Sequence, residues 1–199
     1  KGVILSGSPY SVRDDESPRV DLSLFRGKVP LLGVCYGAQL MAHTLGGEVK
    51  ASKHREYGRA MLTHESHSAL LDSVSPLSQV WMSHGDTITQ IPDNFKIIAS
   101  TESVRVAAFQ IEGEDTFGIQ FHPEVTHTPH GTEILNNFVY EVCKCAGNWR
   151  MSNYADSAAA LVHGATFNSR FASGTVCART QKFSQAPTAS RRKFAALKD

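Results

Sequence analysis

Short apolar runs alternate with segments of helical spacing through the first 145 residues. Six such runs predict strands, at 2–5, 29–34, 80–82, 95–100, 106–111 and 116–121. The run at 29–34 is apolar throughout, which is typical of a parallel strand buried on both faces. It leads directly into 36–45, whose apolar positions have helical spacing, and Gly46 and Gly47 are expected to end that helix.

The second half of this region predicts a hairpin and a second helix. Gly113 and Glu114 lie between two expected strands and favour a tight turn there. Residues 132–145 have apolar side chains on one helical face. Strand–helix–strand order followed by an antiparallel excursion indicates an α/β fold with a mixed sheet.

Composition narrows the class of protein. The chain has 199 residues, 41% of them hydrophobic, and a formal net charge of +1, which argues against a nucleic-acid partner. No apolar run approaches the roughly 18–20 residues that a membrane-spanning helix needs, so we expect no membrane partner. Four cysteines in this length are too few for a disulfide scaffold, so a reducing, cytoplasmic compartment is expected.

Charge divides the chain into two parts. Residues 151–199 have seven basic and two acidic side chains, no Glu, and many Ala and Ser residues. Residues 1–150 have 13 basic and 17 acidic side chains. This change predicts a folded domain over 1–150 and a basic tail over 151–199 that is disordered or aberrant.

Residues 33–37 read Gly-Val-Cys-Tyr-Gly, between an expected buried strand and an expected helix. This is the thiol form of a nucleophile elbow, in which small flanking residues allow close packing around a strained turn. At the start of a helix, the dipole and the free N–H groups would favour the thiolate of Cys35. The alternative is that Cys35 is an ordinary buried cysteine in a tight turn.

A cysteine nucleophile needs a base, and the base needs a group that orients it. His122 and Glu124 follow the expected strand 116–121, with Pro123 restricting the backbone between them. Because active groups gather at the carboxyl ends of parallel strands, we expect Cys35 and His122 to lie close together. The alternative for a histidine at a strand end is a purely structural role.

Metal chemistry is not supported by the sequence. His-x-Glu at 122–124 also opens the zinc deaminase signature, but the required Pro-Cys-x-x-Cys does not follow. Cys143 and Cys145 have the wrong spacing and are expected to be structural residues at a helix end. The segment His64–His67 is one residue short of the His-Glu-x-x-His motif of zinc proteases.

The motifs at 33–39 and 121–125 together resemble the class I, or triad, glutamine amidotransferase family. Within it, the chain is most similar to the glutaminase domains of glutamine-hydrolysing GMP synthases. Supporting segments are 4–9, 17–19, 81–86, 122–128 and the pattern Cys143-x-Cys145 followed by Trp149. The resemblance covers about residues 1–154 and implies a flavodoxin-like, mixed and mostly parallel sheet flanked by helices.

The resemblance implies a mechanism and a site. Cys35 would attack the side-chain amide of L-glutamine, His122 would move the proton to ammonia, and Glu124 would orient His122. The backbone N–H groups of Ser8 and Tyr36 would form the oxyanion hole. The glutamine-binding positions that it implies are Gly7, Gln39, Ser83, His84, Gly85 and Asp86. Without the resemblance, His84 and Asp86 would be assigned to a turn between strands.

The resemblance also implies a partner. The ammonia would aminate XMP to GMP on a synthetase (ATP pyrophosphatase) domain, in cis or in trans, and ATP and Mg²⁺ are implied only for that domain. This chain is expected to bind no cofactor or metal itself.

Three departures from the family pattern qualify the assignment. The family's first strand is missing before Lys1, Ser8 stands where the family has Gly, and 151–199 lack the Ser-Gly-Gly-x-Asp-Ser loop of the synthetase. The alternatives are therefore a catalytically silent remnant, or another class I amidotransferase or γ-glutamyl hydrolase-like thiol enzyme.

Overall fold

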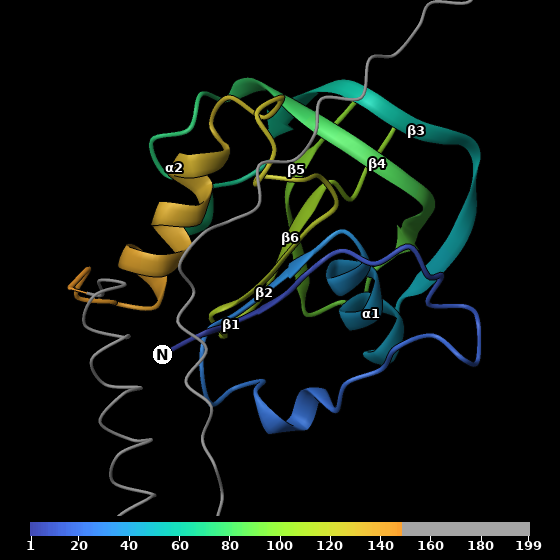
Figure 1. Ribbon diagram of the computed structural model, residues 1–199, viewed down its shortest axis with the longest axis horizontal. Coiled ribbons are helices and arrows are strands. Elements are labelled where there is room, and N and C mark those ends of the chain that lie inside the picture. The colour runs from blue at the N-terminus through green and yellow to red at the C-terminus, as the bar shows by residue number, and fades with distance from the viewer. Residues whose placement is uncertain (149–199) are drawn as a thin grey trace, which may run out of the picture. The chain divides into compact units, whose positions relative to one another are not determined.

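The computed structural model describes residues 1–148, apart from the side chains of 53–56, and these residues form one compact unit. The tail expected at 151–199 lies outside the described residues. A single sheet runs through the unit, and helices lie beside it (Figure 1). Among residues 1–148, no helix is long and apolar enough to cross a membrane.

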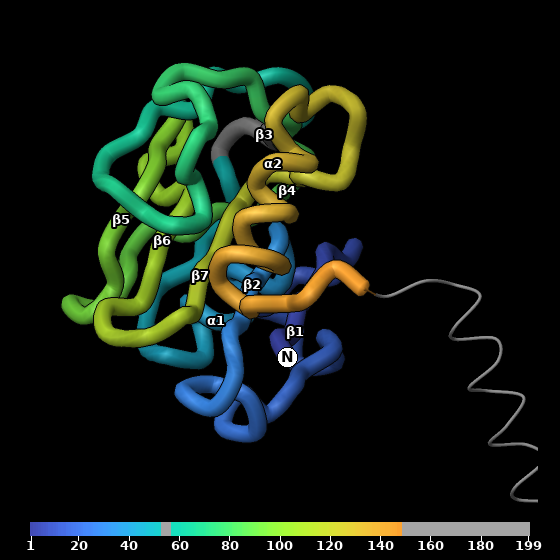
Figure 2. Tube along the Cα trace, turned by 90° about the vertical axis from the view of Figure 1, so that its left-hand side faces the viewer, coloured from blue at the N-terminus to red at the C-terminus, as the bar shows by residue number. Residues whose placement is uncertain are grey.

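The sheet has seven strands in the order β1-β2-β7-β6-β5-β3-β4. Their bounds are β1 Val3–Leu5, β2 Leu31–Val34, β3 Glu48–His64, β4 Leu77–Gln90, β5 Phe95–Ser100, β6 Ala108–Ile111 and β7 Thr116–Ile119. Figure 2 shows β5, β6, β7, β2 and β1 following one another in this order. The sheet therefore brings β2 and β7 side by side, although they are far apart in the sequence.

The direction of the strands corrects one expectation. β1, β2 and β7 are parallel, with Gly33 of β2 opposite Leu5 and Gly118. The other four pairings, β7 with β6, β6 with β5, β5 with β3 and β3 with β4, are antiparallel. The sheet is mixed, as expected, but the expectation that it is mostly parallel is wrong, because the chain returns through hairpins after β3.

Two helices cover opposite faces of the sheet. α1 spans Tyr36–Thr44, and Gly46 after it has a φ of 97°, so the expected glycine stop is confirmed. α2 spans Gly131–Asn136 and continues as a π-helix over Asn137–Val142. The helix expected at 132–145 is therefore present, but its second half is a π-helix. Short 3-10 turns at Leu22–Leu24 and Ala69–Leu71 complete the helical elements.

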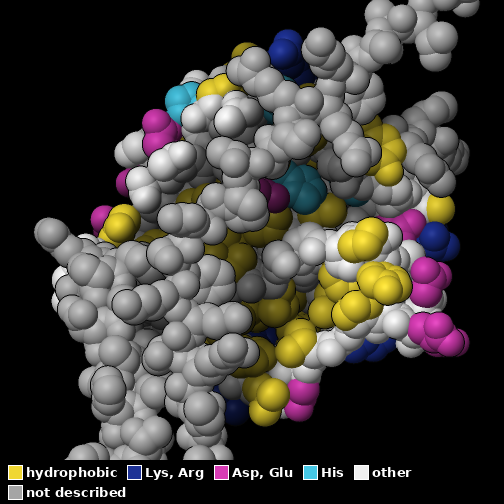
Figure 3. Space-filling view, in the orientation of Figure 1, with side chains coloured by type: hydrophobic (Ala, Val, Ile, Leu, Met, Phe, Trp, Pro, Cys, Tyr) yellow, Lys and Arg dark blue, Asp and Glu magenta, His cyan; other side chains and the backbone are white. Residues whose placement is uncertain are grey.

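The core consists of two apolar clusters, one on each face of the sheet. Leu31 packs in the cluster that contains Met41 of α1, whereas Leu32 packs in the cluster that contains Ile134 and Phe138. This alternation explains why the run 29–34 is apolar throughout, because both faces of β2 are covered. Some large apolar side chains are exposed, and Figure 3 shows such side chains (yellow) gathered on part of one face.

Five of the six expected strands are confirmed with shifts of at most two residues at their ends, and the hairpin at Gly113 is confirmed. Two features of the sequence reading were wrong. The 17-residue strand β3 was not expected, and β4 extends well beyond the expected 80–82. His84 and Asp86 therefore lie within a strand and not in a turn.

Candidate active site

Cys35 lies at a sharp turn between the end of β2 and the first residue of α1. Its backbone has φ 51° and ψ −104°, a region that residues with a side chain rarely adopt. Strained residues of this kind persist where the surroundings fix them, and they gather at functional sites. The conformation is that of a nucleophile elbow, in which the side chain projects from the turn.

The two glycines of the elbow are required by close packing. A Cβ on Gly33 would lie 2.5 Å from Met41 Cε and 2.6 Å from the backbone nitrogen of Ala38. A Cβ on Gly37 would lie 2.2 Å from the carbonyl oxygen of Leu5 on β1. The prediction that close packing around the turn favours small residues beside Cys35 is therefore confirmed, and the turn is held by contacts from β1 and α1.

The sulfur of Cys35 lies between one acceptor and one donor. Its S–H donates to the carbonyl oxygen of Ser83 at 3.8 Å, and Nε2 of Gln120 donates to Sγ at 3.6 Å. Burial raises the pKa of Cys35 to about 11, against weaker opposing effects of the Tyr36 backbone N–H and of Gln120. The expected thiolate is therefore wrong for this state, because burial outweighs the helix terminus.

His122 and Glu124 form a hydrogen-bonded pair just beyond the end of β7. His122 Nδ1 lies 2.7 Å from Glu124 Oε1. Because an ionised carboxylate can only accept, Nδ1 carries the proton, and Nε2 of the neutral ring is an acceptor. Nε2 of His122 is buried, and no group among the described residues forms a hydrogen bond with it. The orientation of the ring thus leaves Nε2 able to accept a proton.

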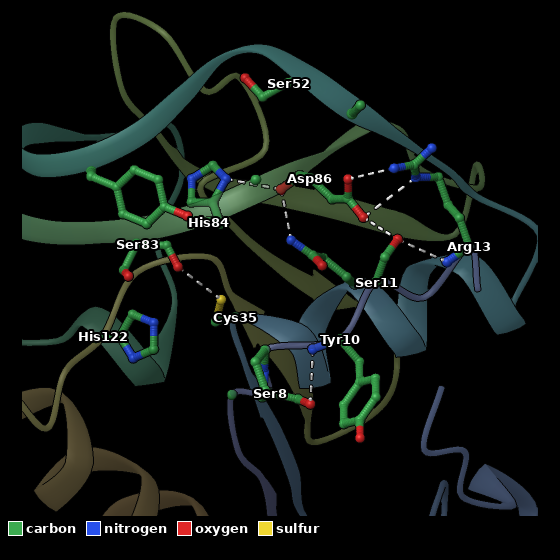
Figure 4. A pocket seen from close by; sticks show the side chains of 16 residues that line it. Ser8, Tyr10, Ser11, Arg13, Cys35, Ser52, Ser83, His84, Asp86 and His122 are labelled. Carbon is green, nitrogen blue, oxygen red and sulfur yellow. Dashed lines mark hydrogen bonds and ion pairs between the residues drawn. The ribbon is translucent and has the colours of Figure 1, made fainter. Parts of the chain in front are cut away.

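Gly7, just beyond β1, shows how closely the cysteine and the histidine approach one another. A Cβ on Gly7 would lie 3.7 Å from Cys35 Cβ, 3.1 Å from His122 Cε1 and 4.0 Å from His122 Nε2. Figure 4 shows the two side chains facing the same space. The structure therefore brings together the groups expected at the ends of β2 and β7, against the chain that leaves β1.

Backbone contacts hold His122 in place. Its N–H donates to the carbonyl oxygen of Trp81 on β4 at 3.0 Å, and its carbonyl oxygen accepts from Thr128 Oγ1 at 2.6 Å. The same hydroxyl accepts from the N–H of Trp81 at 3.1 Å. A Cβ on Gly131, at the start of α2, would lie 1.9 Å from the carbonyl oxygen of Pro123. Strand β4 and helix α2 thus fix the turn from two sides.

The described part of the chain has a cavity of about 720 Å³ at this edge of the sheet (Figure 4). Nine of the residues named in the sequence analysis line it: Gly7, Ser8, Cys35, Gln39, Ser83, His84, Gly85, Asp86 and His122. Glu124 does not line it and lies behind His122. Tyr36 does not line it either: this residue lines a second cavity, of about 320 Å³, and its hydroxyl donates to the carbonyl oxygen of Pro18 at 2.5 Å.

Comparison with known proteins gives the same family on three grounds. The family model described as glutamine amidotransferase class-I matches residues 1–142. The chain is 59% identical over 158 residues to the glutamine-hydrolysing GMP synthase of Cytophaga hutchinsonii, and 56% identical over 161 residues to that of Bacteroides fragilis. These alignments cover 79% and 80% of this chain, but only 31% and 32% of the relatives.

The chain belongs to the class-I glutamine amidotransferase family.

A solved structure agrees with this assignment. A putative GMP synthase subunit from Thermoplasma acidophilum superposes with a TM-score of 0.59 and 27% sequence identity. The alignment covers 79% of this chain and 76% of that chain. The mixed sheet with its two helical faces is thus the class-I glutamine amidotransferase fold.

Within this amidotransferase fold, the backbone at position 8 accepts a serine where the family pattern has a glycine. Among the described residues, the non-glycine positions with positive φ are Cys35, Ser73 and Lys144, so Ser8 does not need a conformation that favours glycine. Its hydroxyl accepts from the N–H of Tyr10 at 3.3 Å. A serine here leaves the backbone N–H in place.

Asp86 fixes the loop that follows β1. Arg13 donates to both of its carboxylate oxygens, at 3.0 Å and 3.4 Å, and the hydroxyl of Ser11 donates to Oδ2. The Asp86 side chain is only 10% exposed, whereas that of Arg13 is 45% exposed. In this state the carboxylate binds the protein's own loop, which forms one wall of the cavity.

Three residues of the site were missed by the sequence reading. Arg13 was assigned to a solvated loop, Thr128 was noted only as part of a family segment, and Gln120 was not singled out. A signal was available for Gln120, because it lies only two residues before His122, at the end of the expected strand 116–121. No local pattern could have paired Arg13 with Asp86.

Within the part of the chain that the structure describes, no three His, Cys, Asp or Glu side chains group as ligands would. Cys143 is buried at the end of the π-helix, where burial raises the pKa of its thiol.

Proposed function

We propose that this chain is a glutaminase that hydrolyses L-glutamine to glutamate and ammonia through Cys35, His122 and Glu124. The observation that carries the proposal is the buried Nε2 of His122, an acceptor without a partner among the described residues, beside the Cys35 thiol. The elbow strain, the close packing at Gly33 and Gly37 and the open cavity support the same assignment.

The first half of the reaction forms a thioester. The S–H of Cys35 turns from the Ser83 carbonyl to Nε2 of His122, which takes the proton as Sγ attacks the amide carbon of glutamine. The oxyanion of the tetrahedral intermediate accepts from the backbone N–H groups of Ser8 and Tyr36. His122 then gives its proton to the leaving nitrogen, and ammonia departs.

The second half reverses the roles. His122 takes a proton from water, the hydroxide attacks the thioester carbon, and the proton returns to Sγ as glutamate leaves. Glu124 keeps Nδ1 protonated and stabilises the imidazolium that forms twice in the cycle. Gly7, Gln39, Ser83, His84, Gly85 and Asp86 are the proposed glutamine-binding positions. No cofactor or metal enters these steps.

We propose further that the ammonia serves the amination of XMP to GMP, because the relatives are glutamine-hydrolysing GMP synthases. The chain spans about a third of their length, so the synthetase domain that would use ATP and Mg²⁺ is a proposed partner, in cis or in trans. A reducing, cytoplasmic compartment suits the proposal, since Cys35 must stay a free thiol.

The experiment is glutamate release from L-glutamine, measured with and without an added synthetase domain carrying XMP and ATP. We expect turnover that is lost in Cys35→Ala and kept in Cys145→Ala, a matched change at a cysteine outside the cavity. Stimulation by the synthetase domain would support the GMP synthase assignment. No turnover by folded protein under either condition would contradict the glutaminase.

A second candidate is compatible with the open cavity of about 720 Å³, which has room for a substrate larger than glutamine. A γ-glutamyl hydrolase-like enzyme would use the same cysteine on a larger substrate. Preference for γ-glutamyl peptides over free glutamine, measured with the same purified protein, would support this candidate.

A further inference from the structure

Gln120 is a buried residue that faces the reactive sulfur. It is 1% exposed, and its N–H donates to the carbonyl oxygen of Ala107 at 2.8 Å, which anchors its backbone beyond the end of β7. The backbone N–H of Cys35 donates to the carbonyl oxygen of Ile119 at 2.8 Å. The two residues thus sit across the β2–β7 pairing, and Nε2 of Gln120 lies 3.6 Å from Cys35 Sγ.

A chain of hydrogen bonds determines which end of the Gln120 amide meets the sulfur. Nε2 of Gln39 donates to the backbone carbonyl of Asp86 at 2.7 Å and to Oε1 of Gln120 at 3.1 Å. A backbone carbonyl can only accept, so the amide group of Gln39 must present its nitrogen there. Gln120 must then present its oxygen to Gln39, which leaves its nitrogen facing Cys35.

This direction of donation has a chemical consequence. A hydrogen bond donated to sulfur stabilises the thiolate more than the thiol, whereas the Ser83 carbonyl stabilises only the thiol. Burial disfavours ionisation of the Cys35 thiol. A donor fixed towards Sγ counteracts this effect and makes the thiolate easier to form.

We propose that Gln120 is a further catalytic residue, whose amide N–H stabilises the Cys35 thiolate, and that Gln39 is the positioning residue that orients it. The proposal rests on the proposed function for its role in glutamine hydrolysis. Its chemical content is independent of turnover, because it concerns the ionisation of one thiol. For Gln39, it adds an orienting role through its Nε2 to the proposed role in glutamine binding.

The test is the rate of alkylation of Cys35 by iodoacetamide between pH 6 and 10, in the absence of glutamine. The tryptic peptide 29–50 holds Cys35 and no other cysteine, so mass spectrometry reads this site alone. We expect Gln120→Met to slow alkylation by about tenfold to a hundredfold at a given pH, as loss of a charge-assisted hydrogen bond predicts. The profile of rate against pH should move to higher pH.

Four further variants, one of them a control, keep the test decisive. Gln120→Glu keeps the side-chain shape but replaces the donor by an acceptor, so it should slow alkylation at least as much. Gln39→Met should slow it less, and the double variant Gln39→Met with Gln120→Met should be no slower than Gln120→Met alone, because both act through one contact. Gln110→Met is the matched control, since the amide of Gln110 on β6 hydrogen-bonds to Glu114 and Ser68 and not to Cys35.

The outcomes separate this proposal from the proposed function. Wild-type alkylation profiles in folded Gln120→Met and Gln120→Glu would overturn the role of Gln120, even if glutamine is hydrolysed. A shifted profile in protein that hydrolyses no glutamine would support the role of Gln120 and contradict the glutaminase.

Discussion

The two walls of the cavity are built differently. One wall consists of the parallel strands β1, β2 and β7, where Cys35 and His122 are fixed by backbone contacts that leave no room for a Cβ at Gly33 or Gly37. The other wall includes the β3–β4 hairpin, where a Cβ on Gly85 would meet nothing within 4 Å.

This difference separates chemistry from recognition. Nucleophile and base need positions fixed to a fraction of an ångström, which close-packed backbone supplies. A substrate-binding wall needs open space and polar side chains, and on β4 His84 and Asp86, which we propose to bind glutamine, line the cavity. We therefore expect changes on the parallel side to affect rate or folding, and changes on the hairpin side to affect substrate binding.

The largest effect is expected at the base. His122→Gln should lower kcat for glutamine hydrolysis by about 10²- to 10⁴-fold, because proton transfer at both half-reactions is lost. Glu124→Gln should cost about tenfold, since it keeps an acceptor oxygen near Nδ1 but removes the charge. His130→Gln is the control, because His130 forms the same kind of pair with Glu133 away from the cavity. Similar kcat values for His122→Gln and His130→Gln would refute the role of His122.

Replacing a glycine by alanine in each wall tests how tightly that wall is packed. Gly37→Ala should lower the free energy of unfolding by about 3 kcal/mol, because its Cβ would lie 2.2 Å from the backbone of Leu5 and must displace β1. Gly85→Ala should change it by less than about 0.5 kcal/mol and act instead on the KM for glutamine. Urea unfolding of both variants gives the comparison, and equal stabilities would show that the elbow is not tightly packed.

Alkaline pH should reveal the buried thiol. The folded pKa of Cys35, about 11, lies above the ordinary thiol value of 9.0, so the unfolded chain loses this proton first as the pH rises. The stability from this residue is therefore complete below pH 9 and falls by about 3 kcal/mol between pH 9 and 11. Urea unfolding of wild type and Cys35→Ser under reducing conditions measures it. Parallel pH curves for the two proteins would argue against a buried, protonated Cys35.

The smallest effect is expected from the loop after β1, which Arg13 and Asp86 hold beside the cavity. Arg13→Ala should change the free energy of unfolding by less than about 1 kcal/mol, because the Arg13 side chain is 45% exposed and solvent screens its pair with Asp86. It should raise the KM for glutamine severalfold and leave kcat within about twofold. Arg105→Ala, at an exposed residue away from the cavity, is the control. A fall in kcat without a change in KM would show that this loop affects the chemical step and not substrate binding.

The sequence predicted the parallel side of the molecule well. The apolar run before Cys35, the helical spacing after it and the glycines around it are local signals, and the structure confirms each of these elements. His122 could be placed at the end of β7 because the strand before it is apolar and short. The elements of this region follow local sequence signals, but their packing joins β1, β2 and β7, which are far apart in the sequence.

The hairpin side could not be predicted in the same way. β3 is rich in charged residues without a clear alternation, and it is stabilised by pairing with β4 over a long register that includes two irregularities. The hydrogen bond from Gln120 to Cys35 and the contact of Arg13 with Asp86 depend on which strands become neighbours. The pKa of Cys35 could not be predicted either. The helix N-terminus beside Cys35 is visible in the local sequence, but the burial that raises the pKa depends on the whole fold.

The most direct measurement is labelling with a glutamine analogue that carries a chloroketone in place of the side-chain amide, followed by mass spectrometry of the tryptic peptides. We expect one adduct per chain on peptide 29–50, at Cys35, formed much more slowly in His122→Gln and prevented by excess L-glutamine. Labelling spread over the peptides that contain the other cysteines, or labelling of Cys35 that L-glutamine does not slow, would contradict it.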